Sequence, residues 1–224
     1  MSDFGNLAVG LVMAGSFAIG ATRRLLERRR ARRELQSRPD LADLGDPEEG
    51  IVVRVTGTVR ARRPREADRE PVILVAPLSG KSCFVYRARV TSSGSLVRGA
   101  APPRESFAIV AFALERDDGE LVEVEGVHAL LDLPDRLSSP KTTDDRARRA
   151  NFLLHHGLPS SAGGVFDEIV IEAGMRIAIA GLVMKDAGAP PGGETGYRDD
   201  AKPTLRLAGD LAHPLVIGEP DVRP

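Results

Sequence analysis

The chain has 224 residues, a net charge of −1 and a single cysteine, Cys83, which excludes a disulfide framework or a cysteine-rich zinc site within the chain. Its charge is unevenly distributed. Residues 1–33 hold seven arginines against two carboxylates, a local charge of +5, whereas the remainder holds 24 basic and 30 acidic residues, a charge of −6; a mildly acidic body argues against nucleic-acid binding.

The first feature is an uncharged stretch of 19 residues from Phe4 to Thr22. As a helix it would be roughly 28 Å long, close to the thickness of a bilayer core, and a helix satisfies its own backbone hydrogen bonds in lipid. A cleavable signal peptide would carry positive charge before its apolar region, but only Asp3 precedes this one. A buried core helix would show a polar face, which is absent here. We therefore predict a transmembrane helix over residues 4–22, after a tail of residues 1–3.

Basic residues follow the predicted span and none precedes it. By the positive-inside rule, the N-terminus lies outside and the remaining domain lies in the cytoplasm, in a single-pass protein of the plasma (inner) membrane. The same arginines can bind anionic lipid head groups. These membrane-flanking residues are Arg23, Arg24, Arg28, Arg29, Arg30, Arg32 and Arg33.

Small residues recur at every fourth position of the predicted span, at Gly10, Ala14, Ala18 and Thr22. This spacing permits close approach of two helices, so a homo-oligomer formed through this stripe is one hypothesis. A generic span rich in alanine and glycine explains the same pattern without self-association.

Residues 23–37 have a helix-forming composition and predict a basic cytoplasmic stalk helix. Pro39, Gly45 and Pro47 then predict a linker over residues 38–49. Beyond it, apolar residues alternate with polar ones, first in residues 51–61, and this is the period of a half-buried strand. Further strands are predicted at 71–77, 83–90, 106–114, 120–126, 127–131, 166–174, 175–186, 204–210 and 213–219.

One helix is predicted in the body, begun by a cap at Thr142 or Thr143 and followed by Gly157. Many short strands with one short helix predict a mainly β fold class. The expected architecture is an N-terminal transmembrane helix followed by a small β-barrel or sandwich-like domain over residues 50–218, with a tail at 219–224.

No motif in the sequence predicts a catalytic, cofactor-binding or metal site. Gly80-Lys81-Ser82 lacks the glycine that a phosphate loop needs five positions earlier, where Val75 stands. Adjacent His155 and His156 would point about 100° apart on a helix and so do not form the usual metal-binding pair. Cys83 lies in a strand pattern, which favours a structural thiol over a nucleophile.

Two segments resemble the GIDE domain, also called the BAM domain, of membrane-anchored bacterial proteins and of the mitochondrial membrane-anchored ubiquitin ligase. The first is similar at Gly57, Ala76, Pro77, Leu78, Ser79, Gly80 and at Cys83, Phe84, Val85, Tyr86 and Arg87. The second is similar at Glu168, Gly174 and Gly181. The resemblance covers roughly residues 50–185 and implies a binding or interaction module without catalytic residues.

The chain also departs from that family. It has no tryptophan after the third strand and no second predicted span, and a single cysteine cannot supply the zinc ligands of a RING. Ubiquitin-ligase activity therefore does not carry over.

Together these observations predict a membrane-anchored, non-catalytic interaction domain facing the cytoplasm, with an unknown protein partner and no cofactor. Two alternatives remain open. One is a membrane-surface enzyme of hydrolase type whose active site is not visible in the sequence. The other is an oligomeric component of a membrane assembly.

Overall fold

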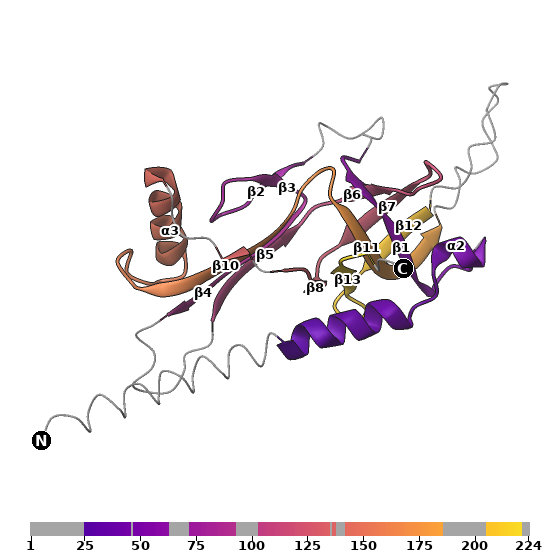
Figure 1. Cartoon of the computed structure of the whole chain (residues 1–224), viewed down its shortest axis with the longest axis horizontal. Helices are drawn as coiled ribbons and strands as arrows, with labels where there is room; N and C mark the ends of the chain where they lie inside the picture. The colour runs from indigo at the N-terminus through magenta and orange to yellow at the C-terminus, as the bar shows by residue number, and fades with distance from the viewer. Residues whose placement is uncertain are drawn as a thin grey trace, which may run out of the picture.

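The computed structural model describes residues 25–45, 47–62, 72–92, 103–134, 136–137, 142–185 and 205–220. These residues form a mainly β protein, which confirms the predicted fold class at this level (Figure 1). The strands are β1 (Val52–Arg60), β2 (Leu74–Val75), β3 (Ser82–Cys83), β4 (Val85–Ser92), β5 (Arg104–Ile109), β6 (Phe112–Glu115), β7 (Leu121–Gly126), β8 (Ala129–Asp132), β9 (Arg136–Leu137), β10 (Gly164–Ile171), β11 (Arg176–Lys185), β12 (Leu205–Gly209) and β13 (Leu215–Gly218).

One sheet closes on itself as a small barrel. Strands β1, β6, β7, β12 and β11 each pair with two others of this set, because β1 also pairs with β11. Ala180 of β11 faces Arg54 of β1 on one side and Val216 of β13 on the other. Strand β11 thus pairs with β12 along one part of its length and with β13 along another. β12 pairs in turn with β7, and β13 pairs with β8, so β13 and β8 extend the barrel wall.

The barrel interior is filled by the alternating apolar residues that predicted its strands. Val53, Val55 and Val59 of β1 are buried, and β1 shows a strict alternation of buried and half-buried residues as far as Val59. The aromatic rings of Phe84 and Phe112 meet inside with centroids 5.9 Å apart. Strands whose apolar residues fall on one face thus form a closed core.

A second sheet, in the order β5-β4-β10-β9, extends away from the barrel and carries helix α3 (Thr143–His155) (Figure 1). Phe152 and Leu153 of α3 pack with Ala88 and Val90 of β4 in a separate apolar cluster. The predicted cap is present: the Thr142 side chain accepts a hydrogen bond from the backbone N–H of Asp145 at 3.1 Å, and the carboxylate of Asp145 accepts one from the backbone N–H of Thr142 at 3.0 Å.

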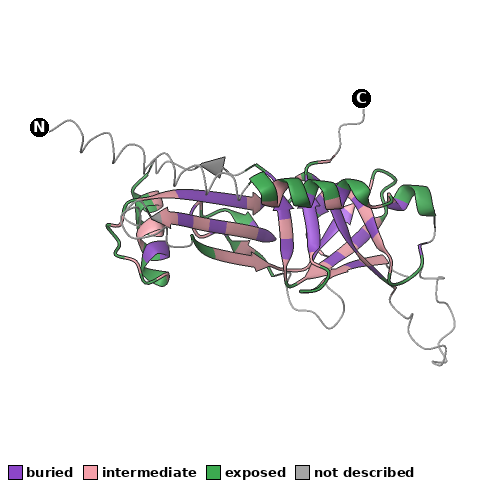
Figure 2. Ribbon diagram, turned by 90° about the horizontal axis from the view of Figure 1, so that it is seen from below, coloured by how far each residue is buried: buried purple, intermediate pink, exposed green. Residues whose placement is uncertain are grey.

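A helix over residues 25–37, called the N-terminal helix below, lies along the outside of the barrel (Figure 2). Its Ala31 and Leu35 are buried against Ala178 and Ala180 of β11 and Val216 of β13. The small alanines alternate with the core residues of β11, so this strand is apolar on both faces and buried on both. The predicted linker, residues 38–49, contains the short helix α2 (Leu41–Leu44), whose Leu41 is buried in the barrel core cluster.

The structure divides some predicted strands. The predicted strand over 83–90 is interrupted at Phe84, and the one over 106–114 is interrupted after Ile109. The reason is that the chain changes sheet at these points. β3 pairs with β2 in a separate two-stranded sheet, β4 and β5 belong to the open sheet, and β6 belongs to the barrel.

Within the described part of the chain, no helix is both long and apolar enough to cross a membrane. The predicted span over residues 4–22, its small-residue stripe (Gly10, Ala14, Ala18 and Thr22) and Arg23 and Arg24 lie outside the described residues. The transmembrane helix therefore stays a prediction from the sequence.

Candidate functional site

The segments that carry the family resemblance meet around the carboxylate of Glu168 on β10. This side chain is only 3% exposed. Its two oxygens accept hydrogen bonds from the backbone N–H groups of Leu78 (2.8 Å) and Ser79 (3.0 Å). Hydrogen bonds to an ionised acceptor are the strong kind, so Glu168 fixes the turn that precedes β3.

This turn also depends on Gly80 and Arg148. Gly80 has φ of +72°, and its N–H donates to the carbonyl of Ala76 at 2.8 Å. Arg148 of α3 reaches over the turn and donates to the carbonyl of Leu78 at 3.3 Å. A Cβ on residue 80 would lie 3.1 Å from the Arg148 guanidinium, so a side chain here would be both strained and crowded.

Cys83 lies in the same region and is 1% exposed. Burial, followed by the charges of Glu168 and Glu172, raises its pKa to about 11, although a backbone hydrogen bond with Ala76 acts in the opposite direction. Burial, followed by the charges of Cys83 and Glu168, likewise raises the pKa of Tyr86. The thiol is therefore protonated at neutral pH and is a poor nucleophile.

Four other residues that carry the family resemblance lie in strands or in a turn between strands. Arg87 lies in β4, Gly174 in the turn between β10 and β11, and Gly181 in β11. Gly57 of β1 immediately precedes the residues that pair with β6, which begin at Thr58. A Cβ on Gly57 would be only 2.6 Å from the carbonyl oxygen of Glu115. The described residues around Glu168 thus form a firmly held turn.

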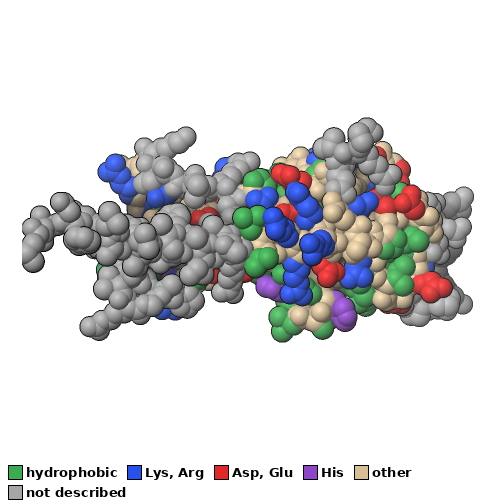
Figure 3. All heavy atoms as spheres, turned by 60° about the horizontal axis from the view of Figure 1, so that its bottom comes forward, with side chains coloured by type: hydrophobic (Ala, Val, Ile, Leu, Met, Phe, Trp, Pro, Cys, Tyr) green, Lys and Arg blue, Asp and Glu red, His purple; other side chains and the backbone are tan. Residues whose placement is uncertain are grey.

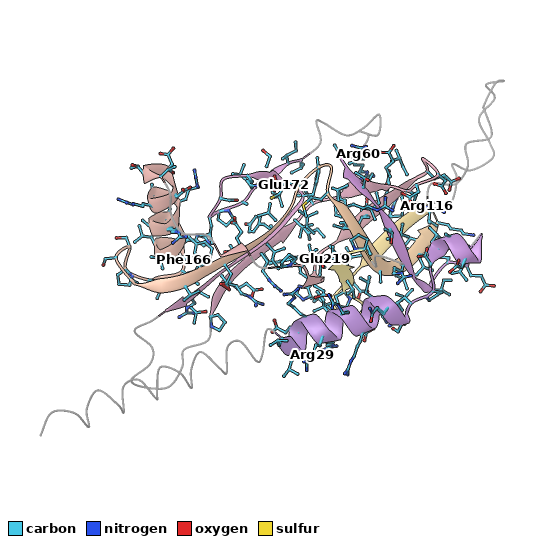
Figure 4. All side chains as sticks on the ribbon, in the orientation of Figure 1. Arg29, Arg60, Arg116, Phe166, Glu172 and Glu219 are labelled. Carbon is cyan, nitrogen blue, oxygen red and sulfur yellow. The ribbon has the colours of Figure 1, made fainter. Side chains whose placement is uncertain are left out.

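The predicted membrane-flanking arginines divide into two sets in the structure. Arg28 and Arg32 turn toward the barrel and pair with the two oxygens of Asp132, at 3.2 and 3.1 Å. Asp132, at the end of β8, is 4% exposed. Arg29, Arg30 and Arg33 are exposed, and Figure 4 shows Arg29 on the side of the helix that points away from the barrel.

A further ion-pair network holds the N-terminal helix to the open sheet. Arg89 of β4 pairs with Glu27 of the helix at 3.2 Å and also with Glu105 of β5. Burial alone would lower the pKa of Arg89, but the charges and hydrogen bonds of Glu105 and Glu27 outweigh it and raise this pKa. Sequence reasoning did not identify Asp132 or Arg89, because a charge within a strand pattern does not show which distant residue it pairs with.

A serine and a histidine meet at the edge of the open sheet. The Oγ of Ser106 on β5 lies 3.0 Å from Nε2 of His156, which caps the C-terminal end of α3. Burial, followed by the positive charges of His155 and Arg104, lowers the pKa of His156, so its ring is neutral at pH 7. Among the described residues, no carboxylate hydrogen bonds to the other ring nitrogen, as a triad would require.

A polar pocket of about 470 Å³ lies between α2, β1 and the β6–β7 turn. Its three arginines are each paired with an aspartate: Arg54 contacts Asp40 at 3.2 Å, Arg116 contacts Asp118 at 2.9 Å, and Arg176 makes two hydrogen bonds to Asp117 at 2.6 and 2.8 Å. The side-chain hydrogen bond from Arg176 holds the pKa of Asp117 below its usual value. Its lining therefore favours no single ligand charge.

The described residues contain no group of three or more His, Cys, Asp or Glu side chains that could hold a metal ion. His155 and His156 lie with ring centroids 5.5 Å apart, while His128 lies against Phe107 and His213 beside Asp210.

No protein-family model matches this chain, and neither the curated proteins nor the solved structures compared with it give a match. The structure thus defines a mainly β protein with a small barrel, and the relation to the GIDE domain stays a prediction.

Proposed function

We propose that this chain is a single-pass membrane protein that presents its β-rich domain to the cytoplasm as a non-catalytic interaction module. One observation carries the proposal: the basic helix that follows the uncharged stretch is docked on the barrel. Two of its arginines pair with a buried carboxylate, while Arg29, Arg30 and Arg33 remain exposed. A helix held in this way ties the orientation of the domain to the segment before it.

The charge distribution supports the direction of insertion. The uncharged residues 4–22 are followed by seven arginines within 11 residues, and the positive-inside rule assigns that end to the cytoplasm. The N-terminus then lies outside, and the mildly acidic body faces the cytoplasm.

The arrangement around Glu168 supports membership of the GIDE, or BAM, group. The two segments that resemble this group are distant in the sequence. A structural contact between them would explain why both patterns are found in one domain. Such a contact is seen here between Glu168 and the N–H groups of Leu78 and Ser79. A single cysteine cannot ligate the zinc of a RING, so the proposal includes no ubiquitin-ligase activity.

Cell fractionation tests the anchor. We expect the full chain in the membrane fraction, resistant to alkaline carbonate and released by detergent, because about 19 uncharged residues suffice for one span. A chain that starts at residue 25 is the matched control and should be released from that fraction by alkaline carbonate. Recovery of the full chain as a soluble protein without detergent would contradict the proposal.

The interaction role is tested by cross-linking in intact cells, followed by affinity purification of the full chain from detergent-solubilised membranes. We expect a defined partner that is recovered with the full chain and is absent when an unrelated single-pass protein is purified in parallel. If neither the cross-linking in cells nor the purification from detergent-solubilised membranes recovers a partner, the result would count against an interaction module.

The hydrogen bond between Ser106 and His156 favours a second candidate, a hydrolase acting at the membrane surface. In that case Ser106 Oγ would attack the carbonyl carbon of an ester and pass its proton to His156 Nε2, which would give it to the departing alcohol as the ester bond breaks. Water would then cleave the acyl-serine bond, releasing the acid and restoring the serine hydroxyl. A fluorophosphonate probe distinguishes the two functions. Labelling that is lost in Ser106→Ala would support the enzyme, and absence of labelling agrees with a binding module.

Self-association through the predicted span is a separate proposal. A transmembrane reporter assay should lose signal when Ala14→Leu and Ala18→Leu are combined, because bulky side chains prevent close helix approach. An unchanged signal would remove this hypothesis.

A further inference from the structure

The two faces of the N-terminal helix carry arginines with different surroundings. On the barrel side, Ala31 and Leu35 are buried, and Arg28 and Arg32 contact Asp132. The opposite side follows the spacing of three and four residues that defines one helix face. It presents Leu26, Arg29, Arg30 and Arg33, all exposed.

The outer face combines apolar and positive side chains. Leu25 is 53% exposed and Leu26 is 59% exposed, which is unusual for two adjacent leucines on a helix that already buries its other face. Figure 3 shows lysine and arginine side chains gathered on this side of the molecule, with hydrophobic side chains beside them. Leucines next to arginines are the combination that binds the interface of a bilayer.

The carboxylates of the N-terminal helix are paired with arginines outside this outer face. The helix has two carboxylates within residues 25–37, and both are half-buried. Glu27 pairs with Arg89 of the open sheet, and Glu34 pairs with Arg38 at 2.9 Å. The arginines on the outer face are thus left to interact with an external anion.

We infer that this outer face, formed by Leu25, Leu26, Arg29, Arg30 and Arg33, lies on a bilayer containing anionic phospholipids, and that the Asp132 ion pairs fix the barrel above it. The inference rests on the proposed anchor, since the predicted span ends three residues before Leu25. It assigns two roles to the arginines of the N-terminal helix: Arg28 and Arg32 hold the helix to the barrel, whereas Arg29, Arg30 and Arg33 contact lipid phosphate. Arg116, at the start of the β6–β7 turn, lies on the other side of the barrel from Arg29 (Figure 4), so this turn then faces the cytoplasm.

The test uses the full chain in lipid nanodiscs, with a fluorophore on a single introduced cysteine and a quencher attached to the lipid. Leu26→Cys reports on the outer face, and Asp118→Cys in the β6–β7 turn reports on the opposite side; the native Cys83 is buried and does not compete. In discs with about one-third phosphatidylglycerol, we expect quenching at residue 26 to exceed that at residue 118 at least threefold. In discs of phosphatidylcholine alone, quenching at residue 26 should fall at least twofold.

Charge reversal provides the matched comparison. Arg29→Glu, Arg30→Glu and Arg33→Glu together should reduce quenching at residue 26 at least twofold in the anionic discs. The control changes the same amount of charge at exposed positions elsewhere, with Arg60→Glu, Arg104→Glu and Arg146→Glu, and should leave that quenching unchanged.

The outcomes separate this inference from the proposed anchor. A chain that enters the discs but shows equal quenching at both sites, or the same quenching in both lipids and in both triple variants, overturns the membrane-facing surface alone. Quenching that appears only after addition of a cell extract would assign the face to a protein instead and also overturn it. A chain that does not enter the discs overturns both.

Discussion

Two buried carboxylates hold different regions of this molecule in different ways. Glu168 accepts two hydrogen bonds from backbone N–H groups of a turn, whereas Asp132 accepts them from the guanidinium groups of two partly exposed arginines. If Glu168 is lost, the backbone N–H groups lose their hydrogen-bond acceptor in a buried region. If Asp132 is lost, the partly exposed arginines can hydrogen bond to water instead. Glu168 therefore stabilises the domain itself, and Asp132 sets the position of a helix on a domain that is already folded.

The largest effect is expected from Glu168→Gln. The amide would place an N–H₂ group against a backbone N–H donor and remove the charge that strengthens both bonds, so the free energy of unfolding should fall by about 3 kcal/mol. Urea unfolding of the full chain in mild detergent measures it. Glu172→Gln is the control: it removes an exposed pair with Lys81 and should cost under about 1 kcal/mol. Equal losses in the two variants would contradict the role given to Glu168.

Cys83 reports on the same region through its reactivity. Its pKa of about 11 lies above the ordinary value of 9.0, so the thiolate fraction at pH 8 is about a hundredfold lower in the folded state than in the unfolded state. Iodoacetamide should therefore modify Cys83 at pH 8 only after denaturation, as measured by mass spectrometry. Because the pKa is raised on folding, the thiol's contribution to stability is present below pH 9 and is lost as the pH rises through 11. Rapid modification of the native chain would show that the thiol is neither buried nor shifted.

Asp132→Asn should have a smaller and more local effect. The arginine side chains are 37% and 56% exposed, so their lost pairing is partly replaced by water, and about 1–2 kcal/mol is expected. Hydrogen exchange should show faster exchange in residues 25–37 and little change in the barrel strands. Asp118→Asn, in the β6–β7 turn, is the control. Faster exchange throughout the barrel would mean that Asp132 supports the whole fold.

His156 should give the smallest effect. Its pKa is lowered by burial and by the charges of His155 and Arg104, so protonation favours the unfolded state. The stability that depends on its neutral form is present above pH 6.5 and is lost as the pH falls through its lower, folded-state pKa. The difference in stability between the native chain and His156→Gln should therefore change by less than about 1 kcal/mol between pH 7 and 5, in the sense that acid weakens the native chain more. A difference that does not change with pH would contradict the shifted pKa.

Much of the fold could be predicted because it depends on local patterns. The alternation in β1, the turn at Asp117-Asp118-Gly119 and the cap at Thr142 each require only neighbouring residues. Gly119 has φ of +81° as such a turn requires, and the Thr142 cap forms as expected. The closure of the barrel by β1 and β11 joins residues more than 100 positions apart, so no local pattern could show it.

The candidate sites show the same division. Glu168 was singled out by resemblance, but its contact with the turn at Leu78 and Ser79 needed the structure. The sequence predicts one lipid-flanking group of arginines, since charge spacing alone cannot show that Asp132, about 100 residues later, pairs with Arg28 and Arg32. Likewise Ser106 carries no motif, and only folding brings it to His156.

Protease shaving of the reconstituted full chain is the direct test of whether residues 4–22 cross a membrane ahead of the docked helix. After proteinase K digestion of closed vesicles, we expect a lipid-protected peptide that covers Phe4 to Thr22 and is recovered by mass spectrometry, while the barrel residues are degraded. The same digestion after detergent removes the bilayer is the control and should destroy the peptide. Digestion of residues 4–22 in intact vesicles would contradict the proposed anchor.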